Sequence, residues 1–201
     1  MHTTPLARTQ SFMTRVILLV TMATGLATAG CGQSGWRDFN SAEGKYSVQF
    51  PGKPEDRSAT YKGGLQAHHH MVELDKATFL VSFIDLPPGQ PFDYARTIQG
   101  MAGRVGGTVT KQSDWTIDGN NGKEFEMKIT STPYFPDGWV ASAGNEGKPV
   151  ELQLTKPKVG FVSSRMVVIN NRLYQIVVIG EEATNDNADV KKFFESFQVT
   201  K

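Results

Sequence analysis

Three consecutive histidines, His68, His69 and His70, are the side chains best suited to chemistry, and they are three of the four histidines in the chain. The surrounding segment 65–74 has the alternating pattern of a β-strand, which places His68 and His70 on one face. Two imidazoles at this spacing can share one metal ion, so His68 and His70 are predicted as metal ligands. The other ligands are not specified, because Glu73 points to the opposite face and no zinc-protease pattern is present.

The same histidines also have interpretations without a metal. As ordinary strand residues, His68 and His70 would make hydrogen bonds at the surface, and His69 would be partly buried beside Met71 on the other face. A response to pH in the imidazole range is a further alternative. Another alternative is an enzyme in which His68 and His70 act with a carboxylate from a neighbouring strand, such as Asp85. We assign no catalytic residue and no cofactor, because the sequence holds no complete catalytic motif.

A cluster of aromatic residues is the second candidate site. Tyr134, Phe135 and Trp139 lie beside prolines in the segment 133–139, inside a long connection from 132 to 158. Long connections in compact domains are often functional, and rigid aromatic side chains supply contact area at small entropic cost. These three residues are therefore predicted to bind a protein partner or a sugar ring. The alternative is that they fold back and cover one end of the core.

The single cysteine of the chain, Cys31, comes shortly after the apolar stretch 16–26. The residues before this stretch include Arg8 and Arg15 and no acidic residue, a combination typical of a secretory signal peptide. The apolar stretch is too short to span a bilayer, which requires about 20 apolar residues. We therefore predict that residues 1–30 are a signal peptide and that the protein is exported.

The small residues 28–30 in front of Cys31 resemble the lipobox of bacterial lipoproteins, in which the cysteine becomes the acylated first residue of the mature chain. This resemblance implies an anchor of acyl chains such as palmitate at Cys31 and a tether over residues 31–38. It also implies a location at the cell membrane or outer membrane, facing the periplasm or the exterior. The pattern departs from the family at Thr28, where leucine is usual. An ordinary signal peptidase could instead cut after Ala29 and release a soluble protein with a free thiol.

Composition argues against nucleic acid as a partner and for one domain without structural metals or disulfides. Removal of residues 1–30 leaves 171 residues with 19 basic and 20 acidic side chains, so the mature chain is close to neutral. Nucleic-acid binding requires a concentrated basic surface, whereas the lysines here are scattered singly. A chain of this length buries about two thirds of its unfolded surface, which suffices for one core. Residues 39–201 are therefore predicted to form a single domain.

Alternating apolar residues and turn signals predict several antiparallel strands. A half-buried strand is expected over 45–50, and the arm 79–84 is apolar at nearly every position, which predicts a strand covered on both faces. Three hairpins with turn residues at their centres are expected over 65–86, 108–131 and 161–179.

Two amphipathic helices are available to cover this sheet. Apolar residues recur every three or four positions mid-chain over 92–105, where Gly106 and Gly107 end the pattern, and near the C-terminus over 190–197, after asparagine caps. The order of strands, helix, strands and final helix predicts an α+β fold. We expect an α/β/α sandwich on a mainly antiparallel sheet of about six to eight strands.

The order of elements over residues 39–201 resembles the PsbP-like fold, whose members end in the same way. Here the strand hairpin 166–179, rich in Val, Ile and Tyr, is followed by a helix that closes with a phenylalanine and a short strand, over 193–199. Proteins with this fold are mostly non-enzymatic assembly or accessory proteins, so the resemblance implies a binding role and carries over no site residues.

The function expected from the sequence is therefore a non-enzymatic, lipid-anchored accessory or binding protein of the bacterial cell envelope. Its partners would be the membrane, through the lipid anchor, and a protein of the envelope. Two alternatives stay open. One is a small exported metal-binding protein or enzyme that uses His68 and His70, and the other is a soluble periplasmic ligand carrier.

Overall fold

The structure is a computed structural model, and it describes residues 35–60, 64–89, 91–129, 140–141, 150–151 and 160–200. The chain divides into two compact units, Met1–Cys31 and Gly32–Lys201, and every described residue belongs to the second. No helix among the described residues is long and apolar enough to cross a membrane. The predicted signal peptide, the predicted acylation site Cys31 and the aromatic residues Tyr134, Phe135 and Trp139 lie outside the described residues.

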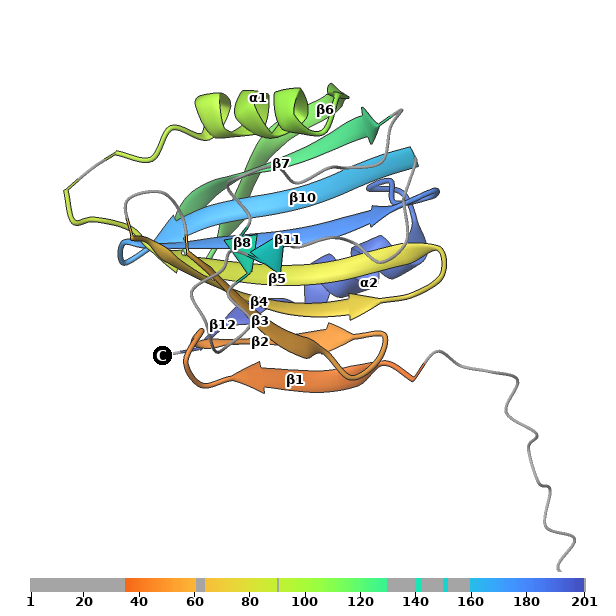
Figure 1. Ribbon diagram of the computed structural model, residues 1–201, viewed down its shortest axis with the longest axis horizontal. Coiled ribbons are helices and arrows are strands. Elements are labelled where there is room, and N and C mark those ends of the chain that lie inside the picture. Colours follow the sequence, from red (N-terminus) through yellow and green to blue (C-terminus); the bar gives the residue numbers. More distant parts are fainter. Residues whose placement is uncertain are drawn as a thin grey trace, which may run out of the picture. The chain divides into compact units, whose positions relative to one another are not determined.

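A large antiparallel sheet forms the centre of the fold (Figure 1). Its strand order is β6-β7-β10-β11-β5-β4-β3-β8-β9, and each neighbouring pair runs antiparallel. The strands are β3 (Glu55–Thr60), β4 (Gln66–Glu73), β5 (Ala77–Asp85), β6 (Gly107–Ile117), β7 (Asn120–Ile129), β8 (Val140–Ala141), β9 (Val150–Glu151), β10 (Gly160–Ile169) and β11 (Arg172–Gly180). Seven of these strands have six or more residues, whereas β8 and β9 have two each. The sequence predicted a sheet of about six to eight strands, and the seven longer strands agree with this number.

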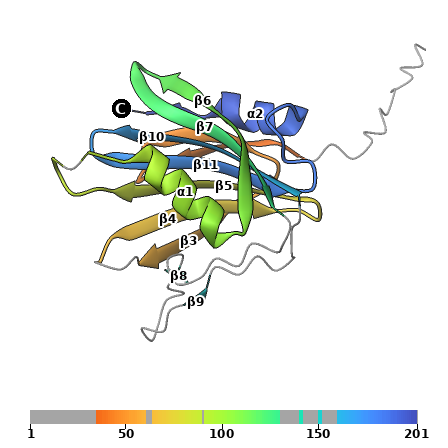
Figure 2. The ribbon, with the colours of Figure 1, turned by 90° about the horizontal axis from the view of Figure 1, so that it is seen from above.

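A small three-stranded sheet and two helices cover the large sheet. The small sheet has the order β1-β2-β12, with β1 (Arg37–Ser41), β2 (Tyr46–Phe50) and β12 (Gln198–Val199). The helices are α1 (Tyr94–Arg104) and α2 (Ala188–Ser196), which lie on opposite sides of the large sheet (Figure 2). The predicted α+β sandwich with one helix mid-chain and one near the C-terminus is confirmed.

Two hydrophobic cores lie on the two faces of the large sheet. Phe79, Val81 and Phe83 of β5 point into a core shared with α2 and the small sheet, whereas Leu80 points into the core beneath α1. Successive side chains of a strand alternate between faces, so one strand supplies both cores. The expectation that the arm 79–84 is covered on both faces is thus confirmed. Burial of each large apolar side chain stabilises the fold by about 1.5–3 kcal/mol.

Both helices begin at a capping side chain and present a buried stripe to the sheet. Asp93 accepts a hydrogen bond from the backbone N–H of Arg96 (2.9 Å) at the start of α1. Asn187 accepts from the backbone N–H groups of Asp189 and Val190 at the start of α2. A capping side chain satisfies donors that have no partner within the helix. Helix α1 ends two residues before Gly106, whose positive φ of 59° fits the expected glycine stop.

The three predicted hairpins are confirmed by the strand pairings of β4 with β5, β6 with β7 and β10 with β11. Asn170 and Asn171 have φ angles of 51° and 62°, which is the backbone geometry that a two-residue turn between such strands requires. The strands β1 and β3 were not predicted. Both are largely polar, so their sequences carry no clear apolar alternation. Strand β1 begins at Arg37, inside the segment expected to be a tether.

Candidate functional site

The predicted pair His68 and His70 lies on one face of β4, toward the small sheet. The ring of His68 stacks on the ring of Phe83, with centroids 4.8 Å apart and planes inclined by 6°. The ring of His70 contacts the ring of Phe39, with centroids 4.6 Å apart. The strand alternation used in the sequence analysis therefore places both imidazoles between β4 and the layer that covers it.

His70 connects the two sheets through a buried hydrogen bond. Its Nδ1 atom lies 2.5 Å from the hydroxyl oxygen of Tyr46 on β2. Burial raises the pKa of Tyr46 far above its usual value, so the tyrosine stays protonated and its hydroxyl donates a hydrogen bond to the imidazole. Burial also lowers the pKa of His70, against the opposing effect of Asp56, whose Oδ1 atom is 3.9 Å from Nε2. A neutral imidazole with an unprotonated Nδ1 fits this arrangement.

His68 belongs to a charged group at the nearby end of the sheet. Its Nε2 atom lies 3.5 Å from Oε1 of Glu43, in the turn between β1 and β2. Arg172 donates two hydrogen bonds to the carboxylate of Asp85 (2.6 and 2.8 Å) and one to the backbone oxygen of Glu43 (2.6 Å). The guanidinium also lies over the ring of Phe83, 4.8 Å from its centroid. We call Glu43, His68, Asp85 and Arg172 the histidine cluster.

The histidine cluster joins the turn between β1 and β2 to the large sheet. The hydrogen bonds from Arg172 lower the pKa of Asp85, which keeps this carboxylate ionised and bound to the guanidinium. Within the described part of the chain, no group of three or more His, Cys, Asp or Glu side chains is arranged to hold a metal ion. The metal ligands proposed from the sequence, His68 and His70, stay a prediction.

His69 points to the other face of β4 and is completely buried. The sequence predicted only partial burial. The structure differs because the face of β4 that carries His69 also carries Met71, which belongs to the core beneath α1, so this face is covered. Burial lowers the pKa of His69 to about 4, and the neighbouring His68 and His70 add to this effect.

Helix α2 borders two grooves, which the sequence did not reveal. A groove of about 810 Å³ lies between α2 and the strands β1 and β2, and a second groove of about 450 Å³ lies between α2 and the strands β6, β7 and β10. Lys191 and Glu195 line both grooves. We call these two residues the α2 ridge. The only sequence signal for it is a polar helix face opposite the buried residues Val190, Phe193 and Phe194.

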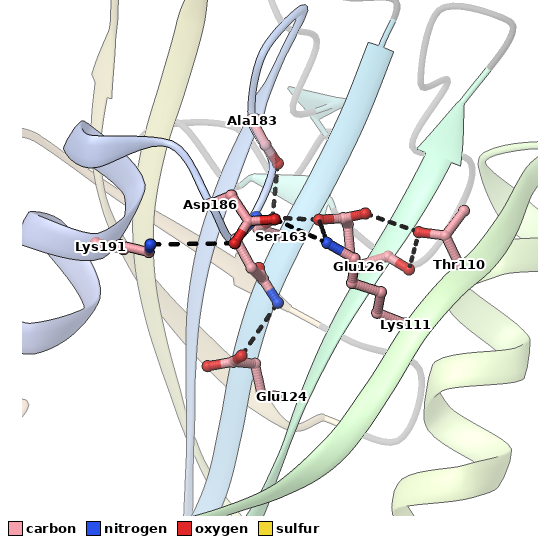
Figure 3. A network of polar contacts seen from close by, with 9 residues as sticks. Thr110, Lys111, Glu124, Glu126, Ser163, Ala183, Asp186 and Lys191 are labelled. Atoms are coloured by element: carbon pink, nitrogen blue, oxygen red, sulfur yellow. Dashed lines mark hydrogen bonds and ion pairs between the residues drawn. The ribbon is translucent and has the colours of Figure 1, made fainter.

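A network of polar contacts forms the floor of the smaller groove (Figure 3). Its centre is Glu126 on β7, whose side chain is only 4% exposed. The hydroxyl of Thr110 donates to Glu126 Oε1 (2.9 Å), and the backbone N–H of Asn185 donates to Oε2 (3.0 Å). The ammonium of Lys111 lies 3.6 Å from Oε2. A buried carboxylate requires such partners, and here they come from β6 and from the connection before α2.

Further contacts of the network attach this connection, residues 181–187, to the sheet. The hydroxyl of Ser163 on β10 donates to the backbone oxygen of Ala183 (2.7 Å), and the side chain of Asn185 donates to Glu124 (3.1 Å). Asp186 receives a hydrogen bond from Lys111 (3.1 Å) and pairs with Lys191 at 4.0 Å (Figure 3). The network thus determines where α2 begins and keeps the ridge in place above the sheet.

A third, smaller cavity of about 190 Å³ lies at the start of α2. Apolar side chains, including Leu74, Phe79 and Val190, line its inner part, and Lys76 and Glu181 stand at its edge. The volume is below the usual range for ligand pockets, about 300–1,000 Å³.

Comparisons with known proteins give one structural similarity. No family model and no curated protein matches the chain. Among solved structures, the chain is similar to cyanobacterial PsbP (CyanoP) from Synechocystis sp. PCC 6803, whose structure was determined in solution. The similarity has a TM-score of 0.48 and 11% sequence identity, and it covers 85% of this chain and 95% of that chain.

Proposed function

We propose that the mature chain is a non-enzymatic binding protein of the bacterial cell envelope, anchored through acyl chains on Cys31. The apolar stretch, the small residues before Cys31 and the absence of any other cysteine in the sequence support the anchor. One acyl chain gives only marginal membrane binding, so a stable anchor requires more than one.

One observation supports the proposed binding role. The side chains best suited to chemistry are already engaged in contacts between layers, as in the hydrogen bond from Tyr46 to His70 and the hydrogen bond from Arg172 to the backbone oxygen of Glu43. The open surface is instead the pair of grooves beside the α2 ridge. Exposed Lys191 and Glu195 can contact a partner without disturbing the core beneath the helix.

The anchor is tested by the intact mass of the protein purified from its native envelope. A chain that begins at Cys31 and carries the added mass of acyl chains supports the proposal, and a Cys31→Ala variant should then leave the membrane fraction. A chain that begins at Gly30 with a free thiol contradicts it. That result would favour the soluble ligand carrier, for which the cavity at the start of α2 is the first place to screen.

The binding surface is tested by photo-crosslinking in native membranes. A crosslinker at position 191 should give a discrete product with an envelope protein, and the charge reversal Glu195→Lys should reduce the yield. A crosslinker at Ala42, an exposed residue in the turn between β1 and β2, is the matched control. Equal products from both positions would refute a role of the α2 ridge.

Metal binding is the second candidate function. It is favoured by the common face of His68 and His70 and by a carboxylate oxygen within 4 Å of each Nε2 atom, from Glu43 at 3.5 Å and Asp56 at 3.9 Å. Calorimetric titration with Zn²⁺ at pH 7.5 should then show one bound ion that a His68→Gln, His70→Gln double variant loses. Absence of binding to the unmodified domain would rule this function out.

A further inference from the structure

Trp36 is held at the start of the fold by residues from two other elements. Its ring meets the ring of Phe79 on β5 edge to face, with centroids 5.8 Å apart. The ammonium of Lys192 on α2 lies 4.6 Å from the centroid of the Trp36 ring. We call Trp36, Phe79 and Lys192 the tryptophan clasp. It defines the point at which the chain enters the fold, because the next residue, Arg37, already pairs with Phe50 in the small sheet.

The chain between the anchor and the clasp is short. Trp36 comes five residues after Cys31. A fully extended chain covers at most about 3.6 Å per residue, so the α-carbons of Cys31 and Trp36 are no more than about 18 Å apart. A domain of this size cannot turn freely at a membrane on so short a connection, since most orientations would bring it into the bilayer.

The clasp lies at one end of the large sheet, and the histidine cluster lies at the other. The start of β1, the turn between β4 and β5 and the start of α2 share the clasp end, on the right in Figure 1. The turn between β1 and β2 and the pair Asp85–Arg172 share the opposite end. Along β5, from Ala77 to Asp85, the separation is about 27 Å at a rise of about 3.4 Å per residue.

We propose that the tryptophan clasp orients the domain on the membrane, with the clasp end facing a lipid surface and the histidine cluster facing away. This inference rests on the anchor at Cys31 that the proposed function includes. The clasp end carries exposed charges of both signs, such as Lys76, Glu181 and Glu182. Charged side chains avoid the apolar interior of a bilayer, so this end faces the lipid headgroups without inserting.

The test measures energy transfer from two labelled positions to the membrane. Lys76→Cys lies at the clasp end and Ala42→Cys at the opposite end, and both positions are exposed. Each variant of the full acylated protein is labelled with a donor dye and reconstituted in vesicles of phosphatidylethanolamine and phosphatidylglycerol. The acceptor is a dye on the lipid headgroup. The donor at position 76 should lie closer to the membrane than the donor at position 42, by about 27 Å.

Two further variants test whether the tryptophan clasp causes the orientation of the domain on the membrane. Trp36→Ala removes the ring that Phe79 and Lys192 hold, and a ten-residue Gly-Ser insertion between Ser34 and Gly35 lengthens the tether. Both should reduce the difference in transfer between positions 76 and 42 while the circular dichroism spectrum stays that of the folded domain. An insertion of the same length at Gly119, in the exposed turn between β6 and β7, is the control and should preserve the difference.

The intact mass of the same samples distinguishes a failure of the proposed orientation from a failure of the proposed anchor. Acylated protein that gives equal transfer from positions 76 and 42 overturns the orientation and leaves the anchor standing. Acylated protein with unequal transfer that Trp36→Ala does not change assigns the orientation to another contact and overturns the role of the clasp. A mass without acyl chains overturns both the proposed anchor and the orientation that depends on it.

Discussion

At the scale of single residues, the three adjacent histidines differ in burial because different residues cover them. His69 is completely buried, His70 is buried against Tyr46, and His68 is partly exposed next to Glu43. The chemical type is the same at all three positions, so the difference in their behaviour comes from desolvation and from their neighbours.

His69 should make the stability of the domain depend on pH. Its pKa in the folded protein is about 4, below the value of 6.5 for an unperturbed histidine, so between these values the unfolded chain binds a proton that the folded protein excludes. Stability should therefore fall as the pH falls from 6.5 toward 4. The contribution of His69 to this loss between pH 7.5 and 4.5 should be about 2–3 kcal/mol.

Urea unfolding at pH 7.5 and 4.5 measures this effect. The variant His69→Gln, which cannot titrate, should lose about 2–3 kcal/mol less than the unmodified protein between the two pH values. The variant Ala42→Gln, at an exposed position in the turn between β1 and β2, serves as the control and should keep the full loss. An identical loss in the His69→Gln variant would show that other groups cause the pH dependence.

The hydrogen bond between Tyr46 and His70 should contribute to stability at neutral pH. Tyr46→Phe keeps the ring packing but leaves the buried Nδ1 atom of His70 without its donor, which should cost about 1–3 kcal/mol of unfolding free energy. Tyr174→Phe is a matched control, because it removes a tyrosine hydroxyl that donates to the backbone oxygen of Gly44 (2.9 Å) and leaves His70 unchanged. The two variants should differ in the histidine proton resonances of His70, which only Tyr46→Phe should shift.

At the scale of elements, the position of α2 depends on a buried carboxylate. Glu126→Gln replaces the charged acceptor of two donors, Thr110 and the backbone N–H of Asn185, by a neutral amide. The expected cost is about 1–3 kcal/mol, because hydrogen bonds to a charged group are replaced by weaker ones. Hydrogen exchange in residues 181–187 should accelerate in this variant and stay slow in Lys191→Gln, which changes only an exposed pair. Unchanged exchange in Glu126→Gln would show that the network does not hold the connection.

At the scale of the whole molecule, two cores share one sheet and should unfold together. Phe193 lies in the core on the side of α2, and Ile98 lies in the core on the side of α1. Phe193→Ala should cost about 3–5 kcal/mol and Ile98→Ala about 2–5 kcal/mol. Because β5 and β11 supply side chains to both cores, either substitution should lower the midpoint of one common unfolding transition. Far-ultraviolet circular dichroism and tryptophan fluorescence should report the same midpoint in each variant, and separate midpoints would contradict this coupling.

The helices, the hairpins and the two-faced central strand could be predicted from the sequence, because each depends on neighbours that are close along the chain. Periodicity identifies a buried helix face, and Asn170-Asn171 identifies a turn. The common face of His68 and His70 follows from the same alternation. These features require no knowledge of what packs against them.

The strand order, the partners of the histidines and the α2 ridge became visible only in the tertiary structure. Tyr46 and His70 are 24 positions apart, and Asp85 and Arg172 are 87 positions apart. Local sequence patterns carry no information about such pairings, since they arise when distant strands become neighbours in a sheet. For the same reason the full burial of His69 and the grooves beside α2 depend on the packing of whole layers, which no single segment specifies.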